Sequence, residues 1–280
     1  MPRSKSATNS TGRIFVPSFC SPGTILDRVS ILRMKAANFR NATKLYTVQY
    51  ELELLASIWA EMGYPPWYDV AGYTDIADIN GWLWELENRA RLHEVNGVFG
   101  ARFRATIRTI HHLNSYRASL RASLDAYFVG QDYPKIVEIA VGVDAYLDGV
   151  AILAVMAKRA ASEDQKKSAL LQKSSWLTLW TKLGFPDDAF DTPDFAMLTL
   201  ANERIWDTKD ALVEAEAVKH FDDAYVRTGR SLYIANDRRV QLKKRVALTY
   251  NSGVWDEKEY VRYPMPEDWD DDQLTWKGFS

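Results

Sequence analysis

Two stretches of the chain carry the same polar residues at the same spacing. Residues 108–117 read RTIHHLNSYR, and residues 230–239 read RSLYIANDRR. Each stretch begins with Arg, has Asn at its seventh position and ends with Arg. Because a pattern that recurs at a fixed separation indicates a structural unit present twice, this pair constrains the fold more than any other feature of the sequence.

The match extends, in order, over most of the chain. The segments LDRVSILRMKA (26–36) and LDGVAILAVMA (147–157) align at an offset of 121 residues, and the offset becomes 122 after one inserted residue. The matched residues are mostly aromatic, small or polar: Trp59/Trp180, Gly63/Gly184, Pro65/Pro186, Asn80/Asn202, Trp84/Trp206, Glu94/Glu216 and Phe99/Phe221. An ordered series with a single slip predicts a tandem duplication, with helical repeats over 20–130 and 131–250.

Each copy has the signals of four helices and almost none of β-strands. Two helix starts have a capping residue followed by Pro, and a third has a capping box: Ser21-Pro22, Thr192-Pro193, and Ser162 with Gln165. Gly63 and Gly184, each followed by an aromatic residue and Pro, fit helix C-termini. The sequence therefore predicts an all-α protein in which two four-helix units pack about a pseudo-twofold axis.

The two ends of the chain differ from the repeats in composition. Residues 1–19 hold three basic residues and no acid, which fits a flexible arm or an organellar transit peptide, and the lack of a clear amphipathic helix favours the arm. Residues 251–280 form an acidic, aromatic tail with five acids in 267–272. Acids mixed with aromatic residues are typical of a segment that orders on a partner, and the alternative is a strap packed along its own bundle.

The bulk composition excludes several classes of protein. The net charge is −2, so the chain as a whole has no electrostatic attraction to nucleic acid or to an anionic membrane. No apolar run reaches the length of a membrane span. A single cysteine, Cys20, excludes an internal disulfide and a thiolate metal cluster, and it favours a cytoplasmic, reducing compartment.

The repeated polar residues fall on apolar helix faces. The last helix of each copy places an Asn-x-x-Arg pair, Asn114 with Arg117 and Asn236 with Arg239, on a stripe that is otherwise apolar. A buried guanidinium needs partners, because an unpaired buried charge is very unfavourable. The repeat offers matched carboxylates as counter-charges: Asp27, Asp148, Glu85 and Asp207. We therefore expect an Arg–carboxylate–Asn network in the core of each bundle.

Two interpretations of these networks compete. In the first, the arginines form internal ion pairs that fix the register of the helices. In the second, the Asn-x-x-Arg pairs bind an anionic ligand, with the guanidinium as a bidentate fork and the Asn as its orienting group. The internal charge balance favours the first. Arg108 and Arg230 point about 180° away from the stripe, toward the other copy, a partner chain, an anionic ligand or solvent.

Motifs of known catalytic sites are missing from the sequence. There is no glycine-rich phosphate loop, no nucleophile elbow and no set of side chains with metal-ligand spacing, so we expect no metal and no cofactor. A helical magnesium-dependent pyrophosphohydrolase is disfavoured, because Glu51 and Glu53 do not share a helix face and the second copy has Gln172 and Ser174 there. Basic residues crowd the last helix of each copy, which suits a nucleic-acid surface or, more simply, a solvated helix face.

The second copy also resembles a protein family. It carries Asn202 followed by Trp206 and Asp207, the run RSLYIANDRR at 230–239, and the ending EKEY at 257–260. These motifs resemble those of an uncharacterised family of short all-helical bacterial proteins, a domain of unknown function met near glycosyltransferases of surface polysaccharide synthesis. The start of the first copy, SPGTILDR, is similar to the opening of that family.

The resemblance implies a family unit in tandem duplicate and implies no particular activity. The first copy departs from the family pattern at Ser115-Tyr116, where the family has Asp-Arg, and the second copy lacks the glycine at its helix start. If each ancestral unit held a site, the resemblance therefore implies that at most one composite site remains.

These observations lead to three expected functions. The first is a non-catalytic helical scaffold or assembly protein that acts through protein–protein contacts, either through residues 251–280 or as a homo-oligomer. The second is a binder or enzyme for a phosphorylated metabolite or sugar nucleotide, and the third is a nucleic-acid-binding helical protein. A scaffold predicts that internal carboxylates occupy both Asn-x-x-Arg pairs, whereas a binder predicts an open pocket with one Arg unpaired.

Overall fold

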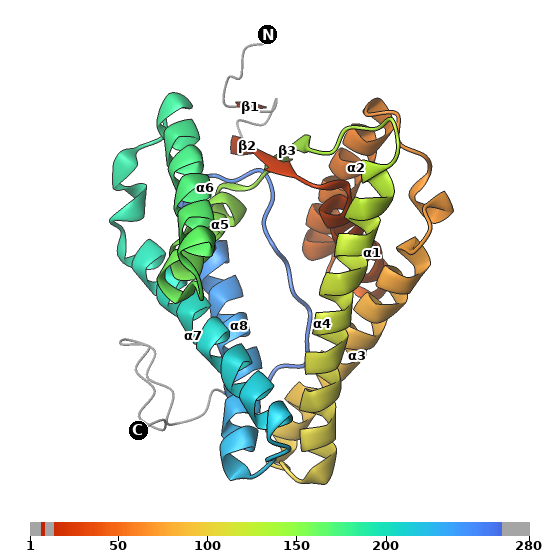
Figure 1. Ribbon diagram of the computed structural model, residues 1–280, viewed down its shortest axis with the longest axis vertical. Coiled ribbons are helices and arrows are strands. Elements are labelled where there is room, and N and C mark those ends of the chain that lie inside the picture. Colours follow the sequence, from red (N-terminus) through yellow and green to blue (C-terminus); the bar gives the residue numbers. More distant parts are fainter. Residues whose placement is uncertain (1–6, 9–13, 265–280) are drawn as a thin grey trace. The chain divides into compact units, whose positions relative to one another are not determined.

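The computed structural model describes residues 7–8 and 14–264 (Figure 1). The helices in this part of the chain are α1 (Pro22–Asn38), α2 (Ala42–Glu61), α3 (Tyr73–Asn96), α4 (Ala101–Val129), α5 (Val143–Arg159), α6 (Glu163–Lys182), α7 (Pro193–Ala217) and α8 (Asp223–Thr249). The shorter elements are the strands β1 (Ala7–Thr8), β2 (Ile14–Cys20) and β3 (Val137–Val141) and the 3₁₀ turns η1 (Trp67–Asp69) and η2 (Asp187–Phe190). The prediction of a mostly helical protein is confirmed. None of the described helices combines the length and apolar character needed to cross a membrane.

The small sheet was not expected from the sequence. The strands follow the order β1-β2-β3, and β1 pairs antiparallel with β2. Pro17 lies in the middle of β2, and proline within a short run argues against a strand when only the sequence is read. The structure thus places residues 14–19 of the expected flexible arm in β2, whereas residues 1–6 and 9–13 lie outside the described residues.

The described residues divide into two compact units. The α1–α4 unit comprises Pro17–Ala140 and Glu257–Tyr263, and the described residues of the α5–α8 unit are 7–8, 14–16, Val141–Asp256 and Pro264. Each unit has four helices, with a 3₁₀ turn between its second and third helices. The boundary after α4 falls at residue 140 rather than at the expected 130, because the connecting residues pack on the first bundle, where Val137 is buried in the core.

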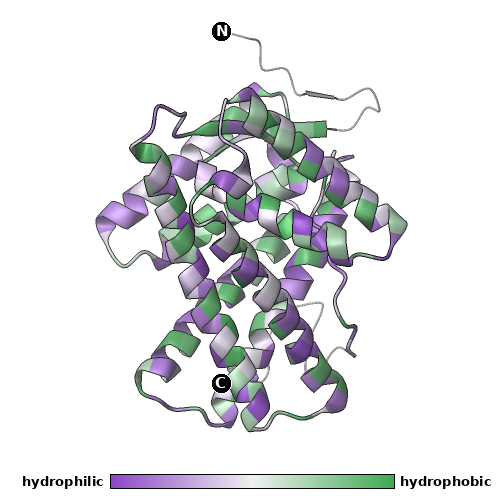
Figure 2. Cartoon of the chain, turned by 90° about the vertical axis from the view of Figure 1, so that its right-hand side faces the viewer, coloured by the Kyte–Doolittle hydropathy of each residue, from purple (hydrophilic) through white to green (hydrophobic). Residues whose placement is uncertain are grey.

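Each unit buries the apolar faces of its helices around a tryptophan. Trp59 stacks on Tyr64 with ring centroids 4.2 Å apart, and Trp180 stacks on Phe185 at 4.3 Å. Each indole N–H donates to the carbonyl of the next proline, at 2.7 Å in the first unit and 2.9 Å in the second. Figure 2 shows hydrophobic and hydrophilic bands on the helices, as expected when a helix buries one face. The matched tryptophans thus have the same local environment in both units.

The helix ends follow the capping chemistry expected from the sequence. Three N-cap side chains each accept a hydrogen bond from the backbone N–H three residues further on: Ser21, Ser162 and Thr192. Gly63 and Gly184 follow α2 and α6 with φ angles of 74° and 77°, a left-handed conformation that glycine adopts without strain. The sequence therefore located these helix ends correctly.

The start of β2 packs on the α5–α8 unit. The Ile14 N–H donates to the Asn251 carbonyl at 3.0 Å, and the Gly253 N–H donates to the Ile14 carbonyl at 2.7 Å. Val16 is fully buried in the apolar cluster that contains the start of α5. A Cβ at Gly253 would lie 2.1 Å from the Phe15 ring, so a larger residue there would displace β2. Residues that precede α1 therefore complete the α5–α8 unit.

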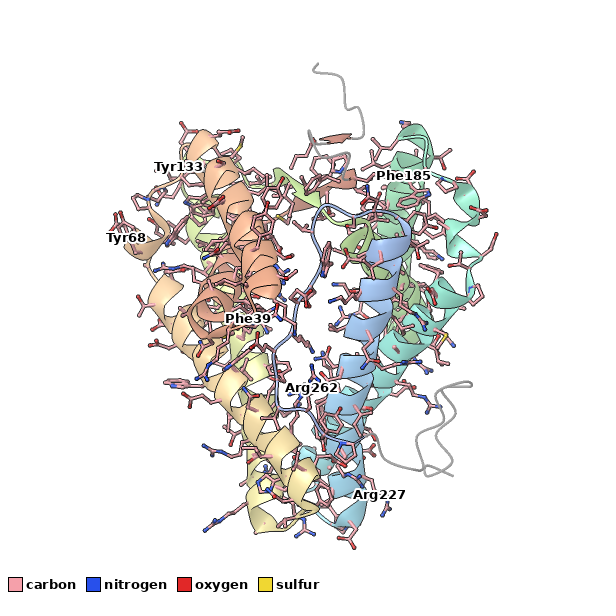
Figure 3. The ribbon with its side chains drawn as sticks, turned by 180° about the vertical axis from the view of Figure 1, so that it is seen from behind. Phe39, Tyr68, Tyr133, Phe185, Arg227 and Arg262 are labelled. Carbon is pink, nitrogen blue, oxygen red and sulfur yellow. The ribbon has the colours of Figure 1, made fainter. Side chains whose placement is uncertain are left out.

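The segment Glu257–Tyr263, here called the strap, packs on the α1–α4 unit although it follows α8. The Glu259 carboxylate accepts hydrogen bonds from the backbone N–H groups of Arg40 and Asn41, at 3.3 Å and 3.4 Å, just before α2. Further along, the Val261 N–H donates to Asn88 Oδ1 of α3 at 3.1 Å. Figure 3 labels Arg262 on this segment.

The ring of Tyr260 anchors the strap to α3. Its centroid lies 4.7 Å from that of Trp84. Arg91 Cζ lies over the ring, 3.9 Å from its centroid, in a cation–π contact. Arg91 is fully buried, and its Nη1 also donates to the Glu87 carbonyl at 2.8 Å. Of the two interpretations of the tail, the strap applies to residues 257–263. These residues pack on the α1–α4 bundle, however, and not on the α5–α8 bundle that precedes them in the chain. Residues 265–280 lie outside the described residues.

Candidate functional site

The first candidate site lies between α1 and α4 of the α1–α4 unit. Arg117 donates two hydrogen bonds to Asp27, from Nε to Oδ1 at 2.9 Å and from Nη2 to Oδ2 at 2.8 Å. Asp27 is 4% exposed. This bidentate geometry matches the planar fork of the guanidinium to the carboxylate and is the strongest form of such a pair. The guanidinium that the ligand-binding interpretation assigned to an anion thus binds a carboxylate of its own unit, as the internal ion-pair interpretation expected.

Other polar groups complete this first network. Asn80 of α3 donates from Nδ2 to Asp27 Oδ1 at 2.9 Å and to Ser30 Oγ at 2.7 Å. Arg121 Nη1 lies 3.7 Å from Asp27 Oδ2. The Asp27 carboxylate therefore receives hydrogen bonds from two helices besides its own, which offsets the unfavourable desolvation of a buried charge.

The α5–α8 unit contains a second network with the same geometry. Arg239 of α8 donates from Nε to Asp148 Oδ1 at 2.9 Å and from Nη2 to Asp148 Oδ2 at 2.5 Å. Asn202 of α7 donates from Nδ2 to Asp148 Oδ1 at 2.9 Å. Lys243 Nζ, one turn after Arg239, lies 3.8 Å from carboxylate oxygens of both Asp148 and Asp144.

Electrostatics holds this second network in its charged form. Burial of the Asp148 carboxyl by itself would raise its pKa, but the nearby charges of Arg239 and Lys243 and the hydrogen bonds from Arg239 and Asn202 outweigh burial and lower the pKa below its usual value. Burial would likewise lower the pKa of Arg239, but the charge and hydrogen bonds of Asp148 and the charge of Asp256 raise it. Both partners therefore remain ionised.

The networks differ in where each unit places its additional acid. In the α1–α4 unit that acid is Asp125 of α4, whose Oδ1 accepts from the Gly23 N–H at 2.7 Å in the first turn of α1. A Cβ at Gly23 would lie 2.7 Å from that carboxylate oxygen, so glycine is needed for the contact. In the α5–α8 unit, Asp144 stands at the position of Gly23 and Ala247 at that of Asp125. The acid has thus moved from the last helix to the first.

Several residues expected at the networks lie elsewhere. Asn114 is exposed, and its Nδ2 donates to the Ile110 carbonyl of its own helix at 3.0 Å. Asn236 stays beside its network, where its Oδ1 accepts from Arg239 Nη1 at 3.5 Å, but among the described residues the amide that reaches Asp148 is Asn202. Glu85 is exposed, and Asp207 pairs with Arg159 at 2.8 Å on the surface. Asn114, Glu85 and Asp207 therefore correct the expected composition of the networks.

The amide in each network comes from a different helix than expected. Asn80 and Asn202 supply it, and they were matched residues of the repeat. Their recurrence was the available signal, but their helices gave no reason to prefer them over the Asn residues one turn before each Arg. Arg108 and Arg230 are half-buried, and each interacts with other groups of the structure.

Two observations bear on metal binding and on the cysteine thiol. Among the residues that the structure describes, no group of three or more His, Cys, Asp or Glu side chains is arranged to hold a metal ion. Burial, together with the nearby Asp125 carboxylate, raises the pKa of the Cys20 thiol to about 12, which disfavours the thiolate.

The chain matches no protein-family model, no curated protein and no solved structure. The resemblance to the family of helical bacterial proteins stays a prediction.

Proposed function

We propose that the protein is a non-catalytic helical scaffold that acts through protein–protein contacts. The observation that carries the proposal is the bidentate occupation of both arginines, Arg117 by Asp27 and Arg239 by Asp148. A ligand anion would have to displace a carboxylate that is 4% exposed and held by hydrogen bonds from two helices. Networks of this kind fix how helices pack, which suits a rigid support.

The tandem duplication and the pseudo-twofold arrangement belong to the same proposal. The matched tryptophan stacking, the matched glycine conformations and the matched Arg–Asp–Asn networks support two copies of one ancestral unit. We propose that the ancestral unit belongs to the family of short helical bacterial proteins that the sequence resembles. The partners of the protein would be other proteins that bind the strap or the residues after it, or a second copy of the chain.

The nucleic-acid alternative has less support from the contacts of basic residues. On the surface of the α5–α8 unit, basic side chains pair with acids of neighbouring helices: Lys158 with Glu203 at 2.8 Å, Arg159 with Asp207 at 2.8 Å and Arg245 with Asp194 at 2.7 Å. Paired bases present less free charge to phosphates. This pattern favours a solvated helix face.

A thermal-shift experiment tests the scaffold against the ligand binder. Wild type, Arg117→Met and Arg239→Met are unfolded in the presence of phosphate, sulfate, nucleotides and sugar nucleotides. We expect no ligand to stabilise wild type, and we expect each variant to lose on the order of 3 kcal/mol of unfolding free energy, because it leaves a buried aspartate without its main partner.

Arg245→Met serves as the matched control, because its pair with Asp194 is solvent-exposed and should contribute less than about 1 kcal/mol. A ligand at a hundredfold its dissociation constant would add about 2.7 kcal/mol of stability. If a ligand gives such a shift and either network variant abolishes it, the site is a ligand pocket and the scaffold proposal is overturned.

A further inference from the structure

A groove of about 610 Å³ opens between the second half of α3 and the first half of α4, within the α1–α4 unit. Its walls combine apolar and polar side chains: Leu86, Arg89, Leu92, His93, Asn96, Arg102, Ala105, Thr106 and Thr109. Leu92 is 47% exposed, although large apolar side chains are usually buried. The groove is separate from the Arg117–Asp27 network and from the residues that hold the strap.

Two arginines that line the groove have no acidic partner among the described residues. Arg89 and Arg102 come from different helices and are both exposed, and neither side chain forms a hydrogen bond or ion pair with any residue of the described part of the chain. His93 also lines the groove, and its Nδ1 lies 2.9 Å from the Val98 carbonyl oxygen. Two unneutralised arginines beside an exposed leucine suit an occupant that is both acidic and apolar.

The second unit lacks this chemistry. At the repeat offset of 122 residues, Arg89, His93 and Arg102 correspond to Ala211, Ala215 and Ala224. The three basic side chains are therefore not part of the shared architecture of the two copies. They call for an explanation particular to the α1–α4 unit.

We propose that the acidic segment 267–272 of the same chain docks in this groove. The segment reads EDWDDD, with five acids around Trp269. Its carboxylates complement Arg89 and Arg102, and the Trp269 ring covers the apolar surface that includes Leu92. The inference joins a groove with unpaired cations to a motif that the scaffold proposal leaves unexplained, and it does not depend on that proposal.

The strap brings the chain to α3, the helix that carries Arg89. The Val261 N–H donates to Asn88 Oδ1, so the chain reaches α3 one residue before Arg89 in the sequence. Asn88 and Arg89 differ by about 100° around the helix axis, so the groove lies roughly a quarter turn from the strap. Trp269 is eight residues beyond Val261, and an extended chain of that length spans up to about 26 Å. That reach exceeds the path around a helix about 10–12 Å in diameter.

A photo-crosslinking experiment on the full chain tests the proposal. The aromatic photo-crosslinker p-benzoylphenylalanine replaces Trp269, and the crosslinked peptides are mapped by mass spectrometry after irradiation. We expect crosslinks to α3 and α4 residues between 86 and 109 of the same chain. Mixing isotopically light and heavy protein before irradiation distinguishes crosslinks within a chain from those between chains.

Charge reversal tests the role of the two arginines. We expect R89E/R102E to reduce the crosslink yield by about fivefold, since two exposed ion pairs are lost and two repulsions are created. K167E/K182E, which changes the net charge equally on exposed positions of α6, should leave the yield unchanged. D270N/D271N/D272N changes only the segment and should reduce the yield as R89E/R102E does, which keeps the test valid if charge reversal disturbs the bundle.

Four outcomes would overturn the proposal. Crosslinks that map outside the groove would place the segment elsewhere, and crosslinks found only between light and heavy chains would assign the groove to a second copy. A yield that is insensitive to both the groove and the segment variants would remove the electrostatic argument. In the wild-type chain, inorganic phosphate that protects Arg89 and Arg102 from an arginine-modifying reagent would identify a small anion as the occupant instead.

Discussion

Asp148 shows how a single buried carboxylate depends on its neighbours. Its oxygens meet Arg239 on one side, Asn202 on another and Lys243 at a longer distance, and these groups together lower its pKa although burial opposes this. A group whose pKa is lower in the folded state binds fewer protons there than in the unfolded chain. Its contribution to stability is therefore present at neutral pH and is lost as the pH falls through the folded pKa.

This sign gives a pH prediction for Asp148→Asn. The variant should be less stable than wild type at pH 7, and the difference in unfolding free energy should stay constant down to about pH 5. Below that pH the difference should shrink, because Asp148 of the unfolded wild-type chain, with a pKa near 3.9, takes up a proton before Asp148 of the folded chain does. Urea unfolding at a series of pH values measures this difference. Asp207→Asn removes a surface carboxylate as a control, and a difference for Asp148→Asn that persists unchanged to pH 2.5 would contradict the prediction.

The same residues show what sequence can and cannot predict about a site. The repeat identified Arg117 with Arg239 and Asp27 with Asp148, because a charge on an apolar stripe requires a matched counter-charge. It chose Asn114 and Asn236 as the amides, because they are neighbours of each Arg on the helix. An exposed Asn can bond to its own helix, as Asn114 does, whereas the Asn that reaches Asp27 depends on how a third helix packs.

At the scale of elements, the strap packs on a bundle far from it in the sequence, because it follows α8 and contacts the α1–α4 unit. Tyr260 covers the buried Arg91 and contacts Trp84, and Glu259 bonds to two backbone N–H groups before α2. A carboxylate near a helix N-terminus is also favoured by the helix dipole. The strap therefore stabilises a bundle to which it is not adjacent in the chain.

Tyr260→Ala should destabilise the α1–α4 unit selectively. Loss of the ring exposes Trp84 and removes the cation–π contact from a desolvated guanidinium, and we expect a loss of about 2–4 kcal/mol. Hydrogen exchange followed by mass spectrometry should show faster exchange in α2 and α3 and little change in α5–α8. The exposed neighbour Arg262→Ala is the control, and equal effects on both units would contradict the assignment.

The helices were predictable at this scale and the short strands were not. N-caps, C-terminal glycines and 3.6-residue periodicity are local signals, and the structure follows them at Ser21, Thr192 and Gly63. β2 contains Pro17, and its pairing with the residues after α8 brings together segments far apart in the sequence. A strand of this kind is defined by its partner rather than by its own residues.

At the scale of the molecule, the units do not coincide with continuous halves of the chain. The α5–α8 unit includes residues 14–16, and the α1–α4 unit includes Glu257–Tyr263. A fragment of residues 17–140 would contain all four helices of the first unit but would lack the strap. We expect this fragment to melt at a lower temperature than the same fragment with residues 257–264 joined to its C-terminus by a flexible linker.

Circular dichroism during heating measures the two melting temperatures. A joined segment in which Tyr260 is replaced by alanine is the control, because it has the same length and lacks the ring that contacts Arg91. If all three fragments melt together, the strap contributes nothing to the first bundle and its contacts are incidental.

The crossed position of the strap also bears on how the protein is made. Synthesis must proceed from Ala140 to Tyr263, a further 123 residues (263 − 140), before the first bundle receives its last segment. At typical translation rates of 5–20 residues per second this interval is about 6–25 s. During that time Arg91 and Trp84 lack their contacts with Tyr260. A chain whose synthesis stops before residue 260 never forms these contacts. Surveillance by chaperones and proteases could therefore tell a finished chain from an interrupted one by a site that lies in its first half.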